Sequence, residues 1–212
     1  MECSARETIR RTRAFFDERA AQWDTMISAD HAHRLQRIIE SLPIAPDARI
    51  LDVGCGTGVL FPILAGLLDT RGCVVAVDVS FAMMRETRRR IAQLCNEQAT
   101  PEHLLLQADV VYPPLRPGSF DWVICNSCFP HFHNQQQAVT AMAGLLSPAG
   151  TLIICHTESR AAINELHRTV GGVVGGHALP DAPEMESLVT AAGLQLETLS
   201  DQSDAYLLCA CK

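Results

Sequence analysis

The sequence predicts an α/β fold in which helices cover both faces of a mostly parallel β-sheet. Short apolar runs alternate with amphipathic segments along the chain, which is the pattern of strands joined by crossover helices. Several of these runs are apolar at every position, as strands buried on both faces of a parallel sheet are. The chain ends in two strands joined by four polar residues, and a connection that short can only join antiparallel neighbours.

We expect two helices between about residues 5 and 42, because apolar side chains recur there at helical spacing. The apolar anchors are Phe15, Phe16 and Trp23 on the first helix and Leu35, Ile38, Ile39 and Leu42 on the second. Pro43 and Pro46 then end the helical pattern, because proline lacks the amide hydrogen that a helix interior uses.

Five core strands are expected next along the chain. They are residues 49–53, residues 73–77, a strand that ends with 104–106, residues 120–125 and residues 151–155. A glycine-rich turn follows the first of them. Ser80 is the expected N-cap of the helix after the second strand, because its hydroxyl can accept a hydrogen bond from a free amide of the first turn.

The C-terminal segment is expected to form one more helix and the antiparallel hairpin. Pro183 suits a first helical turn, residues 184–192 form the helix, and Gly193 ends it. The strands of the hairpin are residues 194–200 and 205–211.

Charge and composition favour a cytoplasmic protein without a membrane or nucleic-acid partner. The formal charge of −7 disfavours a phosphate-backbone partner, which needs a basic surface. No apolar run approaches the roughly 18 residues of a transmembrane helix, and the first residues lack the apolar stretch of a secretory signal. Several of the nine cysteines lie in predicted strands, where a thiol behaves as a small apolar group, so no disulfide is expected.

The most informative segment is the turn after the first strand, Asp52-Val53-Gly54-Cys55-Gly56-Thr57-Gly58. Glycines at alternate positions lack the Cβ atoms that would obstruct a sharp turn or the close approach of a ligand. The turn stands between a strand and a helix, where open α/β sheets bind ligands. Its spacing differs from the Gly-x-Gly-x-x-Gly pattern of dinucleotide binding. As an alternative, such a turn could serve tight packing alone.

Acidic residues follow the next two strands. Asp78 stands at the end of the second strand, where a carboxylate can accept both hydroxyls of a ribose. Asp109 has the matching place after the third strand, where it can accept from an exocyclic amine such as that of adenine. Together with the glycine turn they predict a nucleoside site, although either carboxylate could only cap a helix.

These residues resemble the motifs of the class I S-adenosylmethionine-dependent methyltransferases, in particular those of the ubiquinone- and menaquinone-type (methyltransferase type 11-like) subgroup. The similarity covers nearly the whole chain. The segments that resemble family motifs are residues 50–58 (first motif), 78–84 (ribose-side acid), 106–109 (adenine-side acid), 120–126 with 130–132 (fourth strand), 145–150 (turn before the fifth strand) and 16–24 (N-terminal helix).

The resemblance implies a Rossmann-like sheet of seven strands in the order 3-2-1-4-5-7-6, with strand 7 antiparallel. It also implies one methyltransferase domain over residues 1–212, with S-adenosyl-L-methionine as the cofactor. Within that domain we interpret residues 1–47 as N-terminal helices that form part of the substrate cover, and residues 48–212 as the cofactor-binding core.

The resemblance further implies a role for each matching residue. Asp52 and Gly54 would lie along the methionine part of the cofactor, Asp78 would hold the ribose, and Asn126 would close the site near the sulfonium. Met83 would pack on the adenine, or it could be ordinary core. The full implied cofactor set is Asp52, Gly54, Gly56, Gly58, Asp78, Val79, Met83, Asp109, Val110 and Asn126.

Four histidines are candidates for the acceptor side of the site. A sulfonium already activates its methyl group, so the protein mainly aligns the acceptor, and a base is needed only if the acceptor must lose a proton. His131 follows the fourth strand and His156 ends the fifth, and either could act as a catalytic base; His131 could equally serve only to hydrogen-bond a loop. His167 and His177 are further candidates for binding the substrate. The glycine-rich segment 171–176 could be a lid or a plain connector.

A Cys-x-x-Cys also follows the fourth strand, at Cys125 and Cys128, with His131 and His133 just beyond. We expect no metal there, because Cys125 lies within a predicted strand and no second Cys-x-x-Cys exists. A metal bound at this place would instead point to a metal or metalloid acceptor.

The sequence therefore predicts an S-adenosylmethionine-dependent methyltransferase that acts on a small-molecule acceptor. Alternatives are a protein-residue or a metal or metalloid methyltransferase, a catalytically silent domain that binds the cofactor, and an NAD-dependent dehydrogenase. A nucleic-acid methyltransferase is disfavoured, because residues 126–129 read Asn-Ser-Cys-Phe where amino-directed enzymes of that kind carry Asn-Pro-Pro-Tyr-like residues. No motif identifies the acceptor or the oligomeric state.

Overall fold

The centre of the protein is a seven-stranded sheet in the order β3-β2-β1-β4-β5-β7-β6. The computed structural model describes the backbone of residues 2–212 and the side chains from Ala5 onward; Met1, the first residue of the expected substrate cover, lies outside them. β7 is antiparallel to β5 and β6, and the remaining neighbours are parallel. The strands are β1 (Arg49–Val53), β2 (Cys73–Asp78), β3 (Glu102–Gln107), β4 (Phe120–Asn126), β5 (Leu146–His156), β6 (Gln195–Gln202) and β7 (Ala205–Cys211). The implied strand order and the predicted terminal hairpin are confirmed.

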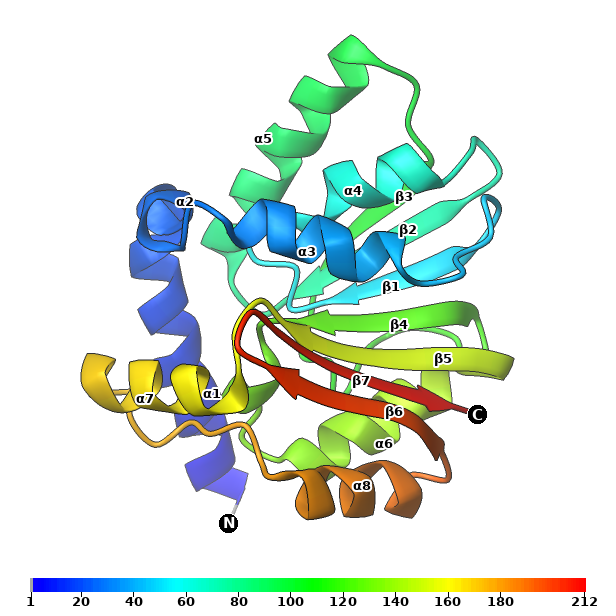
Figure 1. Cartoon of the computed structure of the whole chain (residues 1–212). Helices are drawn as coiled ribbons and strands as arrows, with labels where there is room; N and C mark the ends of the chain where they lie inside the picture. Colours follow the sequence, from blue (N-terminus) through cyan, green and yellow to red (C-terminus); the bar gives the residue numbers. More distant parts are fainter. Residues whose placement is uncertain (1) are drawn as a thin grey trace.

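Helices cover both faces of this sheet, with α3, α4 and α5 on one side and α6 and α8 on the other (Figure 1). α1 runs across the carboxyl ends of the parallel strands, on the left of that view. The helices are α1 (Glu2–Arg19), η1 (Ala20–Gln22), α2 (Trp23–Met26), α3 (His31–Glu40), α4 (Leu60–Leu67), α5 (Phe81–Glu97), η2 (Phe129–His131), α6 (Gln135–Leu145), α7 (Arg160–Val170) and α8 (Ala182–Ala191).

The largest differences between the expected boundaries and the structure occur at two places. The first predicted helix stops at Arg19, and Trp23 begins the separate short helix α2. The fifth strand begins at Leu146 and not at Thr151, because Leu146 already pairs with Phe120. The expected turn over residues 145–150 is therefore wrong: the strand passes through it with a shift of register. Gly150 is required there, since a Cβ would lie 2.9 Å from the Phe120 carbonyl oxygen.

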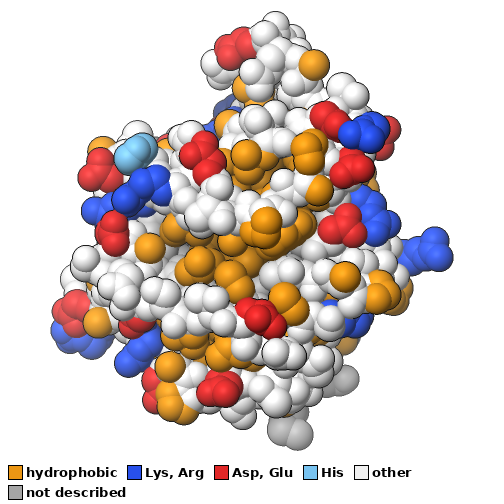
Figure 2. All heavy atoms as spheres, turned by 45° about the vertical axis from the view of Figure 1, so that its right-hand side comes forward, with side chains coloured by type: hydrophobic (Ala, Val, Ile, Leu, Met, Phe, Trp, Pro, Cys, Tyr) orange, Lys and Arg blue, Asp and Glu red, His pale blue; other side chains and the backbone are white. Residues whose placement is uncertain are grey.

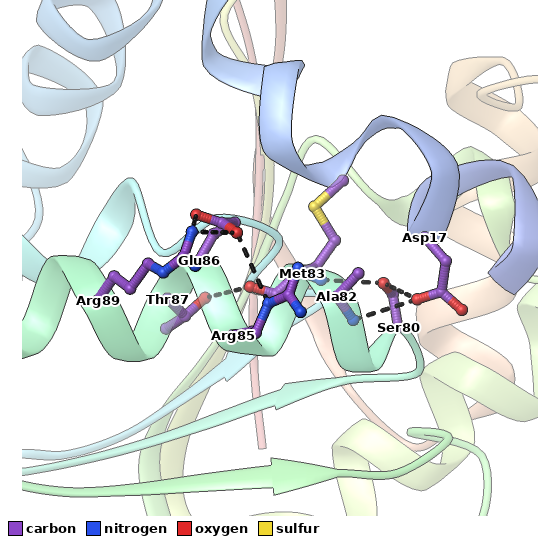
Figure 3. A network of polar contacts seen from close by, with 8 residues as sticks. All are labelled: Asp17, Ser80, Ala82, Met83, Arg85, Glu86, Thr87 and Arg89. Atoms are coloured by element: carbon purple, nitrogen blue, oxygen red, sulfur yellow. Dashed lines mark hydrogen bonds and ion pairs between the residues drawn. The ribbon is translucent and has the colours of Figure 1, made fainter.

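The predicted cap of α5 is confirmed and also attaches α1. The Ser80 hydroxyl oxygen accepts from the Met83 amide at 3.0 Å, and the hydroxyl donates to Oδ1 of Asp17 on α1 at 2.6 Å. The same oxygen of Asp17 accepts from the Ala82 amide at 3.2 Å (Figure 3). A carboxylate at this position also suits the positive end of the α5 dipole. The contact holds α1 against the first turn of α5.

A second contact comes from Asp24 on α2. Its carboxylate accepts from the Thr57 hydroxyl at 2.6 Å and forms an ion pair with Arg90 of α5. α1, η1 and α2 together, residues 2–26, are called the N-terminal cover below. Asp17 and Asp24 attach this cover to α5 and to the glycine turn, and thus hold it over the carboxyl edge of the sheet.

One face of the molecule carries an apolar area. Figure 2 shows hydrophobic side chains gathered near the middle of that face, with acidic and basic side chains mostly toward its margin. The partly buried hydrophobic residues that pack on the α3 and α4 side of the sheet include Trp122, Leu207 and Cys209.

Of the helices that the structure describes, none combines the length and apolar content needed to cross a bilayer.

Replacing Asp17 with alanine is expected to loosen the N-terminal cover. The change removes a helix-capping carboxylate, so the free energy of unfolding should fall by about 1 kcal/mol, and limited proteolysis within α1 should become faster. Glu18→Ala is the matched control, because the Glu18 side chain is exposed and, among the described residues, its ion pair is with the half-buried Arg19 at 3.4 Å. Equal unfolding energies and cleavage rates for the two variants would show that Asp17 does not attach the cover.

Candidate active site

A pocket lies at the carboxyl edge of the sheet, beneath the N-terminal cover. Its walls come from the glycine turn after β1, the end of β2, the segment after β3, the segment from β4 through η2, and the cover itself. The pocket therefore joins segments that are far apart in the sequence. It is the place at which an open α/β sheet is expected to bind ligands.

The glycine turn has a backbone that only glycine adopts without strain. Gly54, Gly56 and Gly58 have φ of +64°, +55° and +78°, in the left-handed region. A Cβ on Gly54 would lie 2.6 Å from Cβ and Sγ of Cys128, and one on Gly58 would lie 2.8 Å from Cγ2 of Thr87. A Cβ on Gly56 would meet no heavy atom closer than 4.0 Å. Thus Gly54 and Gly58 permit close packing behind the turn, while Gly56 faces the pocket.

Asp78 binds the glycine turn directly. Its Oδ2 accepts from the Gly56 amide at 2.9 Å and its Oδ1 from the Ser80 amide at 2.8 Å. Each carboxylate oxygen keeps a further lone pair toward the pocket that Asp78 lines. Burial raises the pKa of Asp78 to about 6, against these two backbone hydrogen bonds. Ser80 and not Asp78 caps α5, so the alternative that Asp78 serves only as the N-cap is wrong.

Asp52 is a second buried carboxyl behind the turn. It is 2 % exposed, and burial together with the negative charge of Asp78 raises its pKa to about 8. Two buried carboxyls that repel one another favour a cation nearby, because a positive charge would relieve the repulsion. Asp52 and Gly58 do not themselves line the pocket; they lie behind the residues that do.

The other members of the predicted cofactor set lie together in the pocket lining. Val79 and Met83 follow β2, Asp109 and Val110 follow β3, and Asn126 ends β4. The carboxylate of Asp109 accepts from the Val111 amide at 3.0 Å, which is a local turn and leaves lone pairs free. Met83 is buried and lines the pocket at the same time, so ordinary core packing and ligand contact are both compatible with its place.

Three of the four predicted histidines come together beside the pocket. The His131 ring centroid lies 4.8 Å from that of His167 and 5.2 Å from that of His177. His131 also packs edge-on against Phe16 of the cover, with centroids 5.0 Å apart. Burial and the neighbouring imidazoles hold the pKa of His131 well below its usual range, and burial lowers the pKa of His167 and His177. The group is therefore neutral at pH 7.

His156 lies beneath this group and lines no part of the pocket. Its ring faces Tyr206 of β7 at 6.2 Å, and burial lowers its pKa to about 3. Among the described residues nothing hydrogen-bonds its buried Nε2 or the Tyr206 hydroxyl. Its electrostatic influence still reaches His131. The structure does not bring His156 to the position expected of a base in contact with the acceptor.

The N-terminal cover supplies pocket residues that sequence analysis did not single out. Ile9 and Thr12 line the pocket beside Phe16 and Trp23, as does Ile27, the residue directly after the cover. The hydroxyl of Thr12 is buried with no hydrogen-bond partner among the described residues, as expected of a group that meets a ligand. The apolar helical spacing of residues 5–26 indicates that this segment packs, but not that it packs against a pocket.

The described cysteines carry free thiols. They are Cys55, Cys73, Cys95, Cys125, Cys128, Cys155, Cys209 and Cys211. Sγ of Cys125 and Sγ of Cys128 lie 3.0 Å apart, and Cys128 contacts the Val53 carbonyl oxygen at 3.0 Å. In the part of the chain that the structure describes, no three or more His, Cys, Asp or Glu side chains are arranged so that they could hold one metal ion. The Cys-x-x-Cys instead packs against the back of the glycine turn.

The pocket suits a nucleoside that carries a positive charge. Its lone pairs at Asp78 and Asp109 match hydroxyl and amine donors, its apolar walls match a heterocycle, and the carboxyls of Asp52 and Asp78 favour a cation. The unsatisfied hydroxyl of Thr12 offers one more polar contact. These residues fit S-adenosylmethionine, which combines adenosine with a sulfonium.

Comparison with known proteins agrees with this chemistry. Residues 51–154 match the family model described as a methyltransferase domain. The chain is 30 % identical over 208 residues to the malonyl-[acyl-carrier protein] O-methyltransferase of Geobacter sulfurreducens. That match covers 92 % of this chain and 74 % of that enzyme. It is 29 % identical over 109 residues to the ubiquinone/menaquinone biosynthesis C-methyltransferase of Wigglesworthia glossinidia brevipalpis. That match covers 51 % of this chain and only 42 % of the relative.

The fold has close counterparts among solved structures as well. A SAM-dependent methyltransferase from Aquifex aeolicus superimposes with a TM-score of 0.71 at 16 % identity, over 91 % of this chain and 97 % of that one. The strand order, the glycine turn and these matches lead to one assignment. The chain belongs to the S-adenosylmethionine-dependent methyltransferases and has the class I fold of that family.

Proposed function

We propose that this chain transfers the methyl group of S-adenosylmethionine to a small-molecule acceptor that binds between the N-terminal cover and His131. The observation that carries the proposal is the two-sided pocket. Asp78, Asp109 and the glycine turn form one side of it, and apolar cover residues with His131 form the other. Such a pocket can align two molecules end to end, which is what methyl transfer from an activated donor requires.

On the cofactor side, each residue has a distinct task in this proposal. Asp78 accepts from the ribose hydroxyls and Asp109 from the adenine amine, while Met83 and Val110 pack against the base. Asn126 stands near the reacting end. When bound, the cofactor supplies a methyl group already activated by its sulfonium. The protein contributes position and a negative environment, because its buried carboxyls compensate the positive charge.

On the acceptor side, residues 1–47 act as part of the substrate cover. Phe16, Trp23 and Phe132 give this half of the pocket an apolar surface, which favours an acceptor with an apolar or aromatic body. One relative is named for an O-methyl transfer on a malonyl carrier protein and another for a C-methyl transfer in quinone biosynthesis. Because those acceptors differ, the cover and the histidines, and not the cofactor motifs, are expected to select the acceptor.

The test of this function is a panel of phenols, quinols, thiols, carboxylic acids and metalloids, incubated with methyl-labelled cofactor. We expect label in a small-molecule product with wild-type protein and much less at the same cofactor concentration with Asp78→Ala. Label recovered in protein would favour the protein-residue alternative, and label on a metalloid the metalloid alternative. Cofactor binding without turnover of any acceptor would favour a catalytically silent domain.

Asp78→Ala is expected to weaken cofactor binding by about 1–3 kcal/mol, the usual cost of leaving buried polar groups unpaired. The variant also leaves the Gly56 amide without its acceptor, so the glycine turn loses support. Isothermal titration calorimetry measures the change directly. Asp204→Ala is the control, because that carboxylate lies in an exposed ion pair with Arg37. An Asp78→Ala affinity equal to that of the control would show that Asp78 is not a cofactor ligand.

Cofactor affinity is expected to rise with pH up to about pH 8. The raised pKa values, about 6 for Asp78 and about 8 for Asp52, mean that both carboxyls are neutral at low pH and ionise as the pH rises. Ionised carboxyls attract the sulfonium, so affinity should increase by up to about tenfold per pH unit below pH 8 and then level off. The histidines of the site do not oppose this trend, because their lowered pKa values keep them neutral there.

S-adenosylhomocysteine is the matched control ligand, because it lacks the sulfonium charge. Its affinity should change less with pH than that of S-adenosylmethionine, and Asp52→Asn should flatten the dependence between pH 6 and 8 for the charged ligand. Identical pH profiles for the two ligands would contradict an electrostatic role for these carboxyls.

A further inference from the structure

We propose that His131 and His177 form a proton path from the acceptor pocket to a second cavity, so that the acceptor gives up a proton as it is methylated. The proposal rests on the proposed methyl-transfer function. It also narrows the acceptor to a molecule that carries a hydrogen on the atom to be methylated.

The two histidines line different cavities and touch each other. His131, at the end of η2, lines the pocket beneath the N-terminal cover. His177, in the segment between α7 and α8, lines a second cavity of about 680 Å³. Phe132 and His133 line both spaces and form the wall between them. Nδ1 of His131 lies 2.9 Å from Nδ1 of His177, so one hydrogen bond links the histidine of one cavity to that of the other.

This hydrogen bond holds a single shared proton. Two ring nitrogens at 2.9 Å attract each other only when one carries hydrogen and the other a lone pair. His167, which is not part of this hydrogen bond, holds the backbone of His177 in position. Its Nδ1 lies 2.8 Å from the His177 carbonyl oxygen, and because a carbonyl only accepts, Nδ1 of His167 must be the donor. His167 thus anchors the backbone that carries the His177 ring.

The path starts with hydrogen on Nδ1 of His131 and a lone pair on its Nε2. A proton that reaches Nε2 of His131 makes Nδ1 a stronger donor, and the shared proton moves to Nδ1 of His177. His177 then releases the proton of its own Nε2 into the second cavity. Both rings return to their first tautomers when the pocket is empty: His131 gives the proton on its Nε2 to water, the shared proton returns to Nδ1 of His131, and Nε2 of His177 takes up a proton from water in the second cavity.

The surroundings of the pair favour passing a proton on over retaining it. The groups packed against His131 are Phe16 from α1, His167 from α7 and His177, with His156 of β5 within electrostatic reach. All the titratable members of this set are imidazoles, whose positive charges disfavour one another. A proton on His131 is therefore held weakly. The positive charge that a proton brings to His131 is compensated, because methyl transfer removes the positive charge from sulfur in the same step.

The reaction balances as a methyl transfer with release of one proton. The acceptor X–H bond breaks and an X–CH3 bond forms, while the electron pair of the old S–CH3 bond stays on sulfur. The proton leaves through His131 and His177. A weakly basic imidazole matches mildly acidic acceptors, which are phenols, enols and thiols, and does not match alkyl alcohols. Carboxylic acids are already ionised at neutral pH and would not need the path. Tertiary amines, which carry no hydrogen, would not use the path.

The test is NMR of protein labelled with ¹⁵N-histidine and saturated with S-adenosylhomocysteine. We expect scalar coupling between Nδ1 of His131 and Nδ1 of His177 across the hydrogen bond. The coupling should vanish in His131→Gln and in His177→Gln and persist in His33→Ala, whose exposed ring on α3 lies outside the site. Failure of the ligand to bind would count against the proposed function. Binding with no such coupling would overturn the proton path alone.

A second readout uses whichever acceptor the panel labels. His177→Ala should lower kcat more than tenfold with little change in KM and should shift the pH profile. Added imidazole should restore much of the rate, because it can enter the second cavity where the lost ring stood. His177→Ala with wild-type kcat, or a loss that imidazole does not restore while the variant keeps its cofactor affinity, would overturn the proton path.

Discussion

The hydrogen bond from the Gly56 amide to the Asp78 carboxylate is the contact on which the rest of the site depends. It joins the glycine turn after β1 to the end of β2 at 2.9 Å, across neighbouring strands that run parallel. The turn can reach Asp78 because its glycines adopt left-handed backbone angles. Once the turn is in place, Cys128 packs behind Gly54 and Thr87 behind Gly58. The carboxylate of Asp78 thus holds the glycine turn in place and is itself a polar group of the pocket lining.

The electrostatics of the pocket divide it into two halves. On the cofactor side, burial raises the pKa of Asp52 and Asp78 and favours a positive ligand. On the other side, burial lowers the pKa of His131 and keeps that ring neutral at pH 7. A cationic donor and a neutral acceptor would therefore be sorted to different ends of the same space. This division is a consequence of burial acting with opposite sign on acids and on imidazoles.

The N-terminal cover connects this chemistry to the fold. Its contacts through Asp17 and Asp24 reach the first turn of α5 and the glycine turn, which are the same segments that line the cofactor half. Its apolar residues, such as Phe16, line the pocket, and Phe16 packs on His131. Movement of the cover would therefore affect both ligands together, since one rigid attachment serves both sides of the pocket.

Local sequence determined the approximate positions of the strands and the cap of α5, and it predicted a pocket at the carboxyl edge of the sheet. Alternating glycines and acids directly after strands have few structural explanations, so Gly54, Gly56, Asp78 and Asp109 could be predicted to lie together before any coordinates, and the structure places all four in the pocket lining. Tertiary structure decided the rest. The start of β5 depended on the pairing of Leu146 with Phe120, which is far from it in the sequence. The contact between His131 and His177 depended on how η2 packs against the segment between α7 and α8. Sequence periodicity reports which side chains are buried along one element, but the partner that buries them is chosen by the folded chain as a whole.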